Sequence, residues 1–245
     1  MKPPLILSLV VAGIISLAPA ADAAGVNLAW DACTPEGGVQ NKSFACNSNS
    51  GGRTLYGSFV LANDQPHFVG AEMTIDIVAE HDSLPPWWQF YNPNTCRRFA
   101  LTVSFSFAIE PNEFCADPWS GQATGGIGAY STPAQPGGDP NSARLTFVAA
   151  VPSTMPMQLS AGTEYYCFKI LISSAKTAGT SACGGCDVPV CILLSRISAV
   201  QNNGTQEDLV TPVVSSVATW QSAESCPAGS TPENITWGQI RSVLR

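Results

Sequence analysis

The residues best suited to chemistry in this sequence are cysteines, above all Cys183-Gly-Gly-Cys186 with Cys191 close behind. Together with Cys226 they would supply four thiolates, the ligand set of a structural zinc ion. A C-x-x-C pair can also exchange disulfides with another protein. The third interpretation, which we favour, is a turn held by disulfides, because no helix is expected after the pair to activate a thiol. One such arrangement joins Cys183 to Cys191 and Cys186 to Cys226.

The chain has nine cysteines, so at least one is left over when all possible pairs form within one molecule. Strand alternation would point Cys167 away from the core, beside Lys169, and Cys167 is therefore the expected unpaired thiol. The disulfide candidates are Cys33, Cys46, Cys96, Cys115, Cys183, Cys186, Cys191 and Cys226.

The spacing of the first four cysteines suggests local disulfides. Cys33 is close to Cys46 in the chain, and Cys96 is close to Cys115, so each pair would close its own loop. A loop of this size stabilises a fold by about 3 kcal/mol because it restricts the unfolded chain.

A second suggestive group consists of flat aromatic side chains. Trp87 and Trp88 follow two prolines, and Tyr91 and Trp119 come later in the chain. Rigid aromatic faces pack well on the apolar faces of sugar rings, so these four residues are the candidate binding platform. The alternative, which we favour, is that Pro-Pro-Trp-Trp plugs one end of the fold.

Residues with a typical catalytic arrangement are sparse. His67 and His81 are the only histidines, and neither a G-x-S-x-G nor an H-E-x-x-H motif occurs. Glu110 and Glu113 could form the carboxylate pair of a glycosidase, but carboxylates at the end of a strand are usually just solvated. We therefore expect a protein that is not an enzyme.

No metal or cofactor is expected. Asp64, Asp76 and Asp82 carry the oxygen ligands that Ca²⁺ prefers. They do not form a spaced Asp-x-Asp-x-Asp loop, so no motif supports a calcium site.

The N-terminus has the layout of a secretory signal peptide. Lys2 supplies a positive charge, residues 5–17 are almost wholly apolar, and Ala21-Asp22-Ala23 fits the small-x-small pattern of a cleavage site. The apolar run is shorter than the roughly 20 residues of a membrane span. We expect residues 1–23 to be removed, and the mature protein to be extracellular or at the cell surface, with no membrane span.

The composition argues against a nucleic-acid partner. Charged residues make up only 12% of the chain, and its net charge is −7. Nucleic-acid binding requires a basic surface that neutralises phosphates, and an anionic membrane surface makes a similar demand.

Period-two alternation predicts the strands that must position these side chains. The pattern is clearest in residues 67–79 and 98–109, and three more apolar runs lie between residues 143 and 200. Shorter strands are expected at residues 25–33, 54–61 and 213–220. Residues 116–142 show no periodic signal and form either a long loop or an irregular strand.

These strands predict an all-β domain over residues 24–220, a two-sheet antiparallel β-sandwich with disulfide-pinned loops. Residues 221–245 are expected to form a linker and a short amphipathic tail, with Trp237, Ile240 and Leu244 at helical spacing. A helix of about eleven residues does not persist alone in water, so the tail must dock, bind a partner or fray.

Two segments resemble known proteins. Residues 68–88 combine an apolar residue and Gly with an alternating strand that ends at a Leu-Pro corner. Residues 143–200 combine a small residue, an Arg and an apolar strand with a Gly-Thr turn, an aromatic strand and a final strand. This order is similar to that of cohesin-like β-sandwiches and related carbohydrate-binding modules.

The resemblance implies a jelly-roll sandwich that recognises a partner and performs no chemistry. The partner is a dockerin module in cohesins and a polysaccharide in the related modules. No binding residue transfers, because no position of this sequence matches a binding motif.

These observations predict a secreted recognition or assembly module that binds an extracellular protein module or a polysaccharide. The alternatives are a carbohydrate-active enzyme and a structural subunit linked to others through Cys167 or the tail. An enzyme requires carboxylates in a cleft, a sugar-binding module an exposed tryptophan cluster, and a protein-binding module a flat apolar surface.

Overall fold

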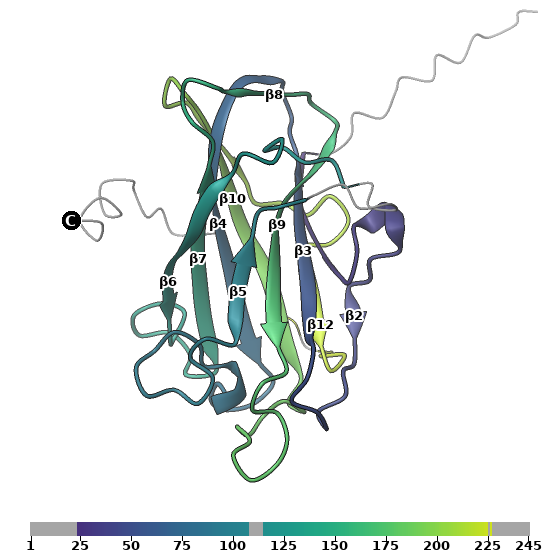
Figure 1. Cartoon of the computed structure of the whole chain (residues 1–245), viewed down its shortest axis with the longest axis vertical. Coiled ribbons are helices and arrows are strands. Elements are labelled where there is room, and N and C mark those ends of the chain that lie inside the picture. The colour runs from purple at the N-terminus through teal and green to yellow at the C-terminus, as the bar shows by residue number, and fades with distance from the viewer. Residues whose placement is uncertain (1–23, 108–114, 225, 227–245) are drawn as a thin grey trace, which may run out of the picture.

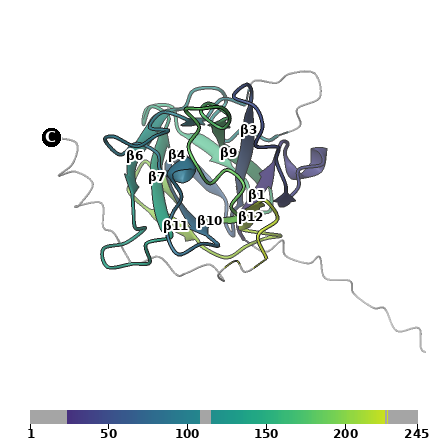
Figure 2. The same ribbon diagram turned by 90° about the horizontal axis from the view of Figure 1, so that it is seen from below.

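The protein folds into a β-sandwich, as the alternating pattern predicts. The computed structural model describes residues 24–107, 115–224 and 226, and its two sheets pack face to face (Figures 1 and 2). The smaller sheet contains, in spatial order, β1 (Gly25–Trp30), β3 (Gly52–Val60), β9 (Glu164–Ser173) and β5 (Leu101–Ser104). The larger sheet contains, in spatial order, β2 (Asn41–Lys42), β12 (Val217–Trp220), β10 (Val190–Gln201), β4 (Gln65–Ala79), β7 (Ser142–Ala150) and β6 (Thr124–Ser131), with β11 (Gln206–Leu209) beside β10 and β8 (Met157–Leu159) beside β4.

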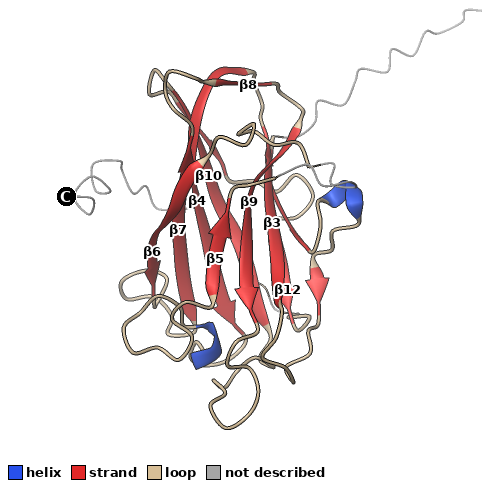
Figure 3. Ribbon diagram, viewed as in Figure 1, coloured by secondary structure: helices blue, strands red, loops and turns tan. Residues whose placement is uncertain are grey.

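Neighbouring strands run antiparallel, except for β12 and β2, which are parallel. The helical elements of the described chain are two 3₁₀ turns, η1 (Thr34–Glu36) and η2 (Pro86–Trp88), drawn in blue in Figure 3. Among the described residues there is no helix with the length and hydropathy of a membrane span. The jelly-roll connectivity stays a prediction, and the predicted signal peptide and residues 227–245 of the tail lie outside the described residues.

The long strand β4 differs from its prediction on one face. Its core face is apolar as expected, but Glu72 and Asp76 on the opposite face are buried as well. Two arginines from the flanking strands cover them: Arg144 Nε and Nη2 lie 2.7 and 2.8 Å from the two carboxylate oxygens of Asp76, and Arg196 pairs with Glu72. Ser195, at a bulge in β10, adds a 2.5 Å hydrogen bond to Asp76. This buried network fixes the register of three strands.

The predicted strand over residues 98–109 is much shorter in the structure. Only Leu101–Ser104 pair with β9. Residues 95–100 instead form a loop that a disulfide from Cys96 holds at the lower end of the sandwich. After the strand, Phe105 turns into the core, where its ring lies 6.3 Å from that of Phe147.

Strand β6 lies within residues 116–142, which showed no periodic signal. It forms the edge of the larger sheet and contains three glycines in the sequence TGGIGAYS. A Cβ on Gly125 would lie 2.0 Å from the carbonyl oxygen of Val148 and 2.9 Å from the Phe105 ring. Close packing therefore requires glycine here, and glycine erases the alternation that reveals a strand.

Cys167 is the unpaired cysteine, but it points into the protein and not out of it. Gly57 pairs with Phe168 and Ser58 with Tyr166, so Cys167 is the extra residue of a β-bulge. The bulge reverses the alternation of β9, and the outward direction predicted for Cys167 is wrong. Its Sγ lies 3.6 Å from the Gly57 carbonyl oxygen, and burial raises the pKa of the thiol. A thiol in this position cannot link chains into an assembly.

Three tyrosines are expected to resist ionisation in the folded protein. Burial raises the pKa of Tyr91, Tyr130 and Tyr166 above the ordinary value. The Tyr130 hydroxyl donates to the carbonyl of Trp88, and that of Tyr166 accepts from the Thr34 amide at 3.0 Å. Because the folded state holds these protons more tightly than the unfolded chain, stability is full below the ordinary tyrosine pKa of about 10 and falls as pH rises above it.

In an alkaline titration, tyrosinate absorbance should therefore include a late step that coincides with the loss of near-ultraviolet circular dichroism. Full ionisation of all five tyrosines while the dichroism persists would contradict this expectation.

Candidate functional site

The predicted aromatic platform is wrong, because its tryptophans are core residues. Trp87, Trp88 and Trp119 are at most 1% exposed. The rings of Trp87 and Trp88 lie 4.9 and 5.4 Å from the ring of Trp220, so they plug the lower end of the sandwich. Tyr91 is half-buried and donates its hydroxyl to the Leu101 carbonyl. The three tryptophans therefore offer no free face to a sugar ring.

The disulfides join distant parts of the chain, so the predicted local pairs are wrong. The pairs are Cys33–Cys115, Cys46–Cys186, Cys96–Cys183 and Cys191–Cys226. Sheet pairing places these segments side by side, which spacing along the chain cannot show. Since each cysteine of the C-x-x-C group has a different partner, neither the four-thiolate zinc site nor the redox pair exists in this structure.

The candidate acidic and histidine residues do not assemble into a site. His67 and His81 are exposed, and Glu110 and Glu113 lie outside the described residues. Within the described part of the chain, one group of three residues has metal-binding geometry, Cys33, Glu36 and Cys115. Two of these three form a disulfide with each other, so their sulfur atoms are not available as thiolates.

The three aspartates proposed as calcium ligands are likewise separate. Asp64 accepts a hydrogen bond of 2.8 Å from the Ala161 amide, and Asp76 is engaged by Arg144 and Ser195. No metal-binding group among the described residues contains them.

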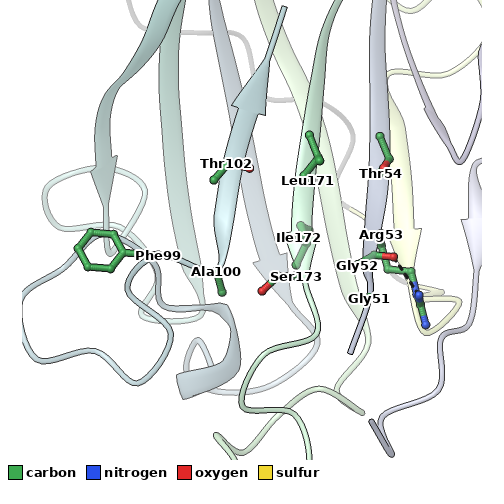
Figure 4. Close-up of a pocket in the computed structure, with 10 residues that line it drawn as sticks. All are labelled: Gly51, Gly52, Arg53, Thr54, Phe99, Ala100, Thr102, Leu171, Ile172 and Ser173. Atoms are coloured by element: carbon green, nitrogen blue, oxygen red, sulfur yellow. Dashed lines mark hydrogen bonds between the residues drawn. The ribbon is translucent and has the colours of Figure 1, made fainter. Parts of the chain in front are cut away.

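Two adjoining pockets on the outer face of the smaller sheet form a groove that the sequence did not reveal (Figure 4). Their volumes are about 390 and 410 Å³, and they share Phe99, Ala100 and Ser173. We call them together the basic groove, and its lining residues are Gly51, Gly52, Arg53, Thr54, Thr95, Cys96, Arg97, Arg98, Phe99, Ala100, Thr102, Leu171, Ile172, Ser173, Ala175 and Lys176.

Strand register places the centre of the groove. Leu171 of β9 lies opposite Thr54 of β3 on one side and opposite Thr102 of β5 on the other. Directly opposed residues share a face of the sheet, so these three side chains form a row across its outer surface. Figure 4 shows this row, with Phe99 on one flank and Arg53 on the other.

Arg97 and a disulfide hold the lower wall of the groove. The guanidinium of Arg97 lies 3.5 Å above the Trp87 ring and donates to the carbonyls of Trp87 and Ala175 at 2.9 and 3.0 Å, and to that of Ser173. Burial lowers the pKa of Arg97 to about 10, so this side chain still carries its charge at neutral pH. The Cys96–Cys183 disulfide ties the same two loops together.

The most exposed large apolar side chain of the described residues is Phe99, at 73%. It stands at the flank of the groove, and the guanidinium of Arg98 lies 4.9 Å from its ring. Leu171, on the row described above, is also exposed, at 40%. A planar apolar surface is thus available to a ligand at this place.

The groove is basic although the chain as a whole is acidic. Arg98 and Lys176 line it with exposed side chains, and none of its lining residues carries a carboxylate. Arg53 also belongs to the lining, but it lies opposite the buried Ile172 on the other face of the sheet, and its guanidinium is 5.1 Å from the Phe44 ring. The ion pairs of the described chain lie elsewhere and leave Arg98 and Lys176 without an acidic partner among the described residues. Lys176 Nζ donates to the Cys96 carbonyl at 2.8 Å, which fixes the position of its charge.

The alternation over residues 98–109 predicts Phe99 on the buried face of a strand, whereas the structure places it in the exposed loop before β5, so this groove was not predicted. The signal that could have found it is the segment Cys96-Arg97-Arg98-Phe99, two adjacent cations before an aromatic residue in a chain with few charges. The other contributions come from strands far apart in sequence and become neighbours only through the sheet.

No protein-family model matches this sequence, and a search of curated proteins finds no similar chain.

Proposed function

We propose that this protein is an exported recognition module that binds a polysaccharide along the basic groove and does not cleave it. The signal-peptide layout of residues 1–23 and the four disulfides support export. The resemblance to cohesin-like and carbohydrate-binding sandwiches agrees with this proposal and stays a prediction.

The observation that carries the proposal is an exposed aromatic ring beside a row of hydroxyl groups. Phe99 can pack on the apolar face of a sugar ring, as flat aromatic side chains do. Thr54, Thr102 and Ser173 provide hydroxyls that both donate and accept hydrogen bonds from sugar hydroxyls. The two adjoining pockets extend the groove over residues of β3, β9 and β5 and the loop before β5, which suits a polymer of several sugar rings.

The lining of the groove also distinguishes this function from its rivals. A glycosidase uses two carboxylates at the bond it cleaves, and the described lining residues supply none. A protein partner would be favoured by a broad apolar patch. Here Phe99 and Leu171 are the large apolar side chains exposed in the groove, and hydroxyls surround them.

The Phe99→Ala variant should bind polysaccharide about tenfold more weakly than the wild-type protein. Loss of an aromatic contact costs up to about 1.5 kcal/mol, and about 1.4 kcal/mol corresponds to a factor of ten in affinity. Affinity for a panel of insoluble and soluble polysaccharides provides the measurement. Val214→Ala, which removes a similarly exposed apolar side chain outside the groove, is the control and should bind normally.

Two outcomes would contradict the proposal. One is wild-type affinity in the Phe99→Ala variant, which would remove the groove from recognition. The other is the absence of binding to every glycan tested, which would favour a protein partner.

A further inference from the structure

We infer that the polymer bound by the basic groove is an anionic polysaccharide, with carboxylates or sulfates on its sugar rings. This inference rests on the proposed function and specifies its ligand.

Charge is distributed unequally over this molecule. The protein carries a net charge of −7, so a surface with several cations and no acid is a local exception. Other cations of the described chain have clear structural roles: Lys42, Arg144 and Arg196 form ion pairs, Arg97 is buried under backbone carbonyls, and Arg53 lies 5.1 Å from the Phe44 ring.

The remaining lysine and arginine side chains of the described residues lie on or beside one surface. Arg98 and Lys176 line the basic groove. Lys169 extends this surface along β9, because it stands on the same outer face, two residues from Leu171, and opposite Ser104 of β5. Its Nζ lies 5.1 and 5.8 Å from the rings of Phe107 and Tyr56, which hold the ammonium group over the sheet.

The charges stand beside the apolar centre of the groove. Phe99 lies on one flank of the row (Figure 4), and the guanidinium of Arg98 is 4.9 Å from its ring. Lys176 lines the groove next to Cys96, whose carbonyl accepts its hydrogen bond. A sugar ring over Leu171 or Phe99 would therefore have cations within reach of the acidic groups on its neighbours along the polymer.

The donors of the groove match anionic groups in their chemistry. A guanidinium presents parallel N–H groups that match the two oxygens of a carboxylate or sulfate, and an ammonium acts as a point charge. A neutral glycan would make no use of these charges, although the hydroxyl groups and Phe99 of the groove would still contact its sugar rings. Charge recognition should therefore add to sugar contact and should be weakened by salt.

The test compares polygalacturonate with the fully methyl-esterified form of the same polymer, because esterification removes the charge and keeps the backbone. At low ionic strength the wild-type protein should bind the acid form at least about tenfold more tightly. The difference should largely disappear at about 1 M salt, where the screening length falls to about 3 Å. A sulfated galactan and its desulfated form provide a second pair that separates sulfate from carboxylate recognition.

The double variant Arg98→Gln/Lys176→Gln should lose the preference for the acid form and keep the weaker binding to the neutral form. Lys42→Gln, which removes a surface cation from an ion pair outside the groove, should behave like the wild-type protein. The double variant removes two positive charges and the control removes one. A general effect of net charge would therefore weaken the binding of the acid form by both proteins, whereas a specific effect of the groove would weaken only that of the double variant.

The outcomes separate this inference from the proposed function. Equal binding to the charged and neutral forms of both polymers would overturn the anionic ligand and leave polysaccharide recognition standing. Binding to polyglutamate with no binding to any polysaccharide would overturn both. A preference for either charged polymer that depends on Arg98 and Lys176 would support the inference.

Discussion

Replacing Gly57 with alanine is expected to destabilise the protein by about 3 kcal/mol, the upper part of the range for overpacking a core. A Cβ at Gly57 would lie 1.9 Å from Cζ of Phe168, directly across the sheet. Phe168 is fully buried and packs edge-on against Phe147 with ring centroids 4.8 Å apart, so it cannot move aside. For a domain of this size the melting temperature should fall by roughly 6–12 °C.

Two further variants make this expectation specific. Gly126→Ala in β6 is the matched control, because a Cβ there would meet no atom within 4 Å. Combining Gly57→Ala with Phe168→Leu should recover part of the stability that the two single variants lose separately, since the smaller side chain frees the space. Additive losses in the double variant would show that the Phe168 ring is not the obstacle.

Replacing Arg97 with alanine is expected to cost about 4 kcal/mol in the free energy of unfolding. The substitution removes the cation stacked on Trp87 and leaves the carbonyls of Trp87, Ser173 and Ala175 without their donor. Each buried acceptor that loses its partner costs about 1–3 kcal/mol, and the losses overlap because the loops relax together. Urea unfolding of the oxidised protein at neutral pH measures this difference.

The neighbouring residue provides a sharp control. Arg98 is exposed, and Arg98→Ala should change stability by no more than about 0.5 kcal/mol. Arg97→Lys should recover only a small part of the loss, because an ammonium cannot reproduce the planar fork of three contacts. Similar stabilities of the Arg97→Ala and Arg98→Ala proteins would mean that the buried guanidinium does not hold the two loops together.

The parts of the fold that the sequence predicted are those with a clear period of two. β4 and β7 follow from the alternation in residues 67–79 and 143–151, and the structure buries the expected side chains on their inner faces. β6 could not be predicted, because its glycines carry no hydrophobic signal. The direction of Cys167 could not be predicted either, because Cys167 is itself the extra residue of a bulge that interrupts the alternation of β9.

The candidate site was harder to predict than the fold for a related reason. Tryptophans are the more obvious candidates for a binding surface in a sequence, but Trp87 and Trp88 fill the end of the core. The exposed aromatic ring is that of Phe99. The groove depends on a register that sets Thr54 and Thr102 on either side of Leu171. Residues that far apart become neighbours only after the sheet has paired.

The disulfide pattern has a consequence for how the molecule reaches its oxidised form. Of the four bonds, only Cys191–Cys226 joins cysteines that follow one another along the chain. Two other cysteines lie between Cys33 and its partner Cys115 in the sequence, and Cys46 pairs with Cys186, which is 140 residues away. The nearest available partners are the wrong ones at each of these steps. We therefore expect the strands to pair before the native disulfides form. A chain that is oxidised before its strands have paired needs thiol–disulfide exchange to replace the wrong disulfides with the native ones.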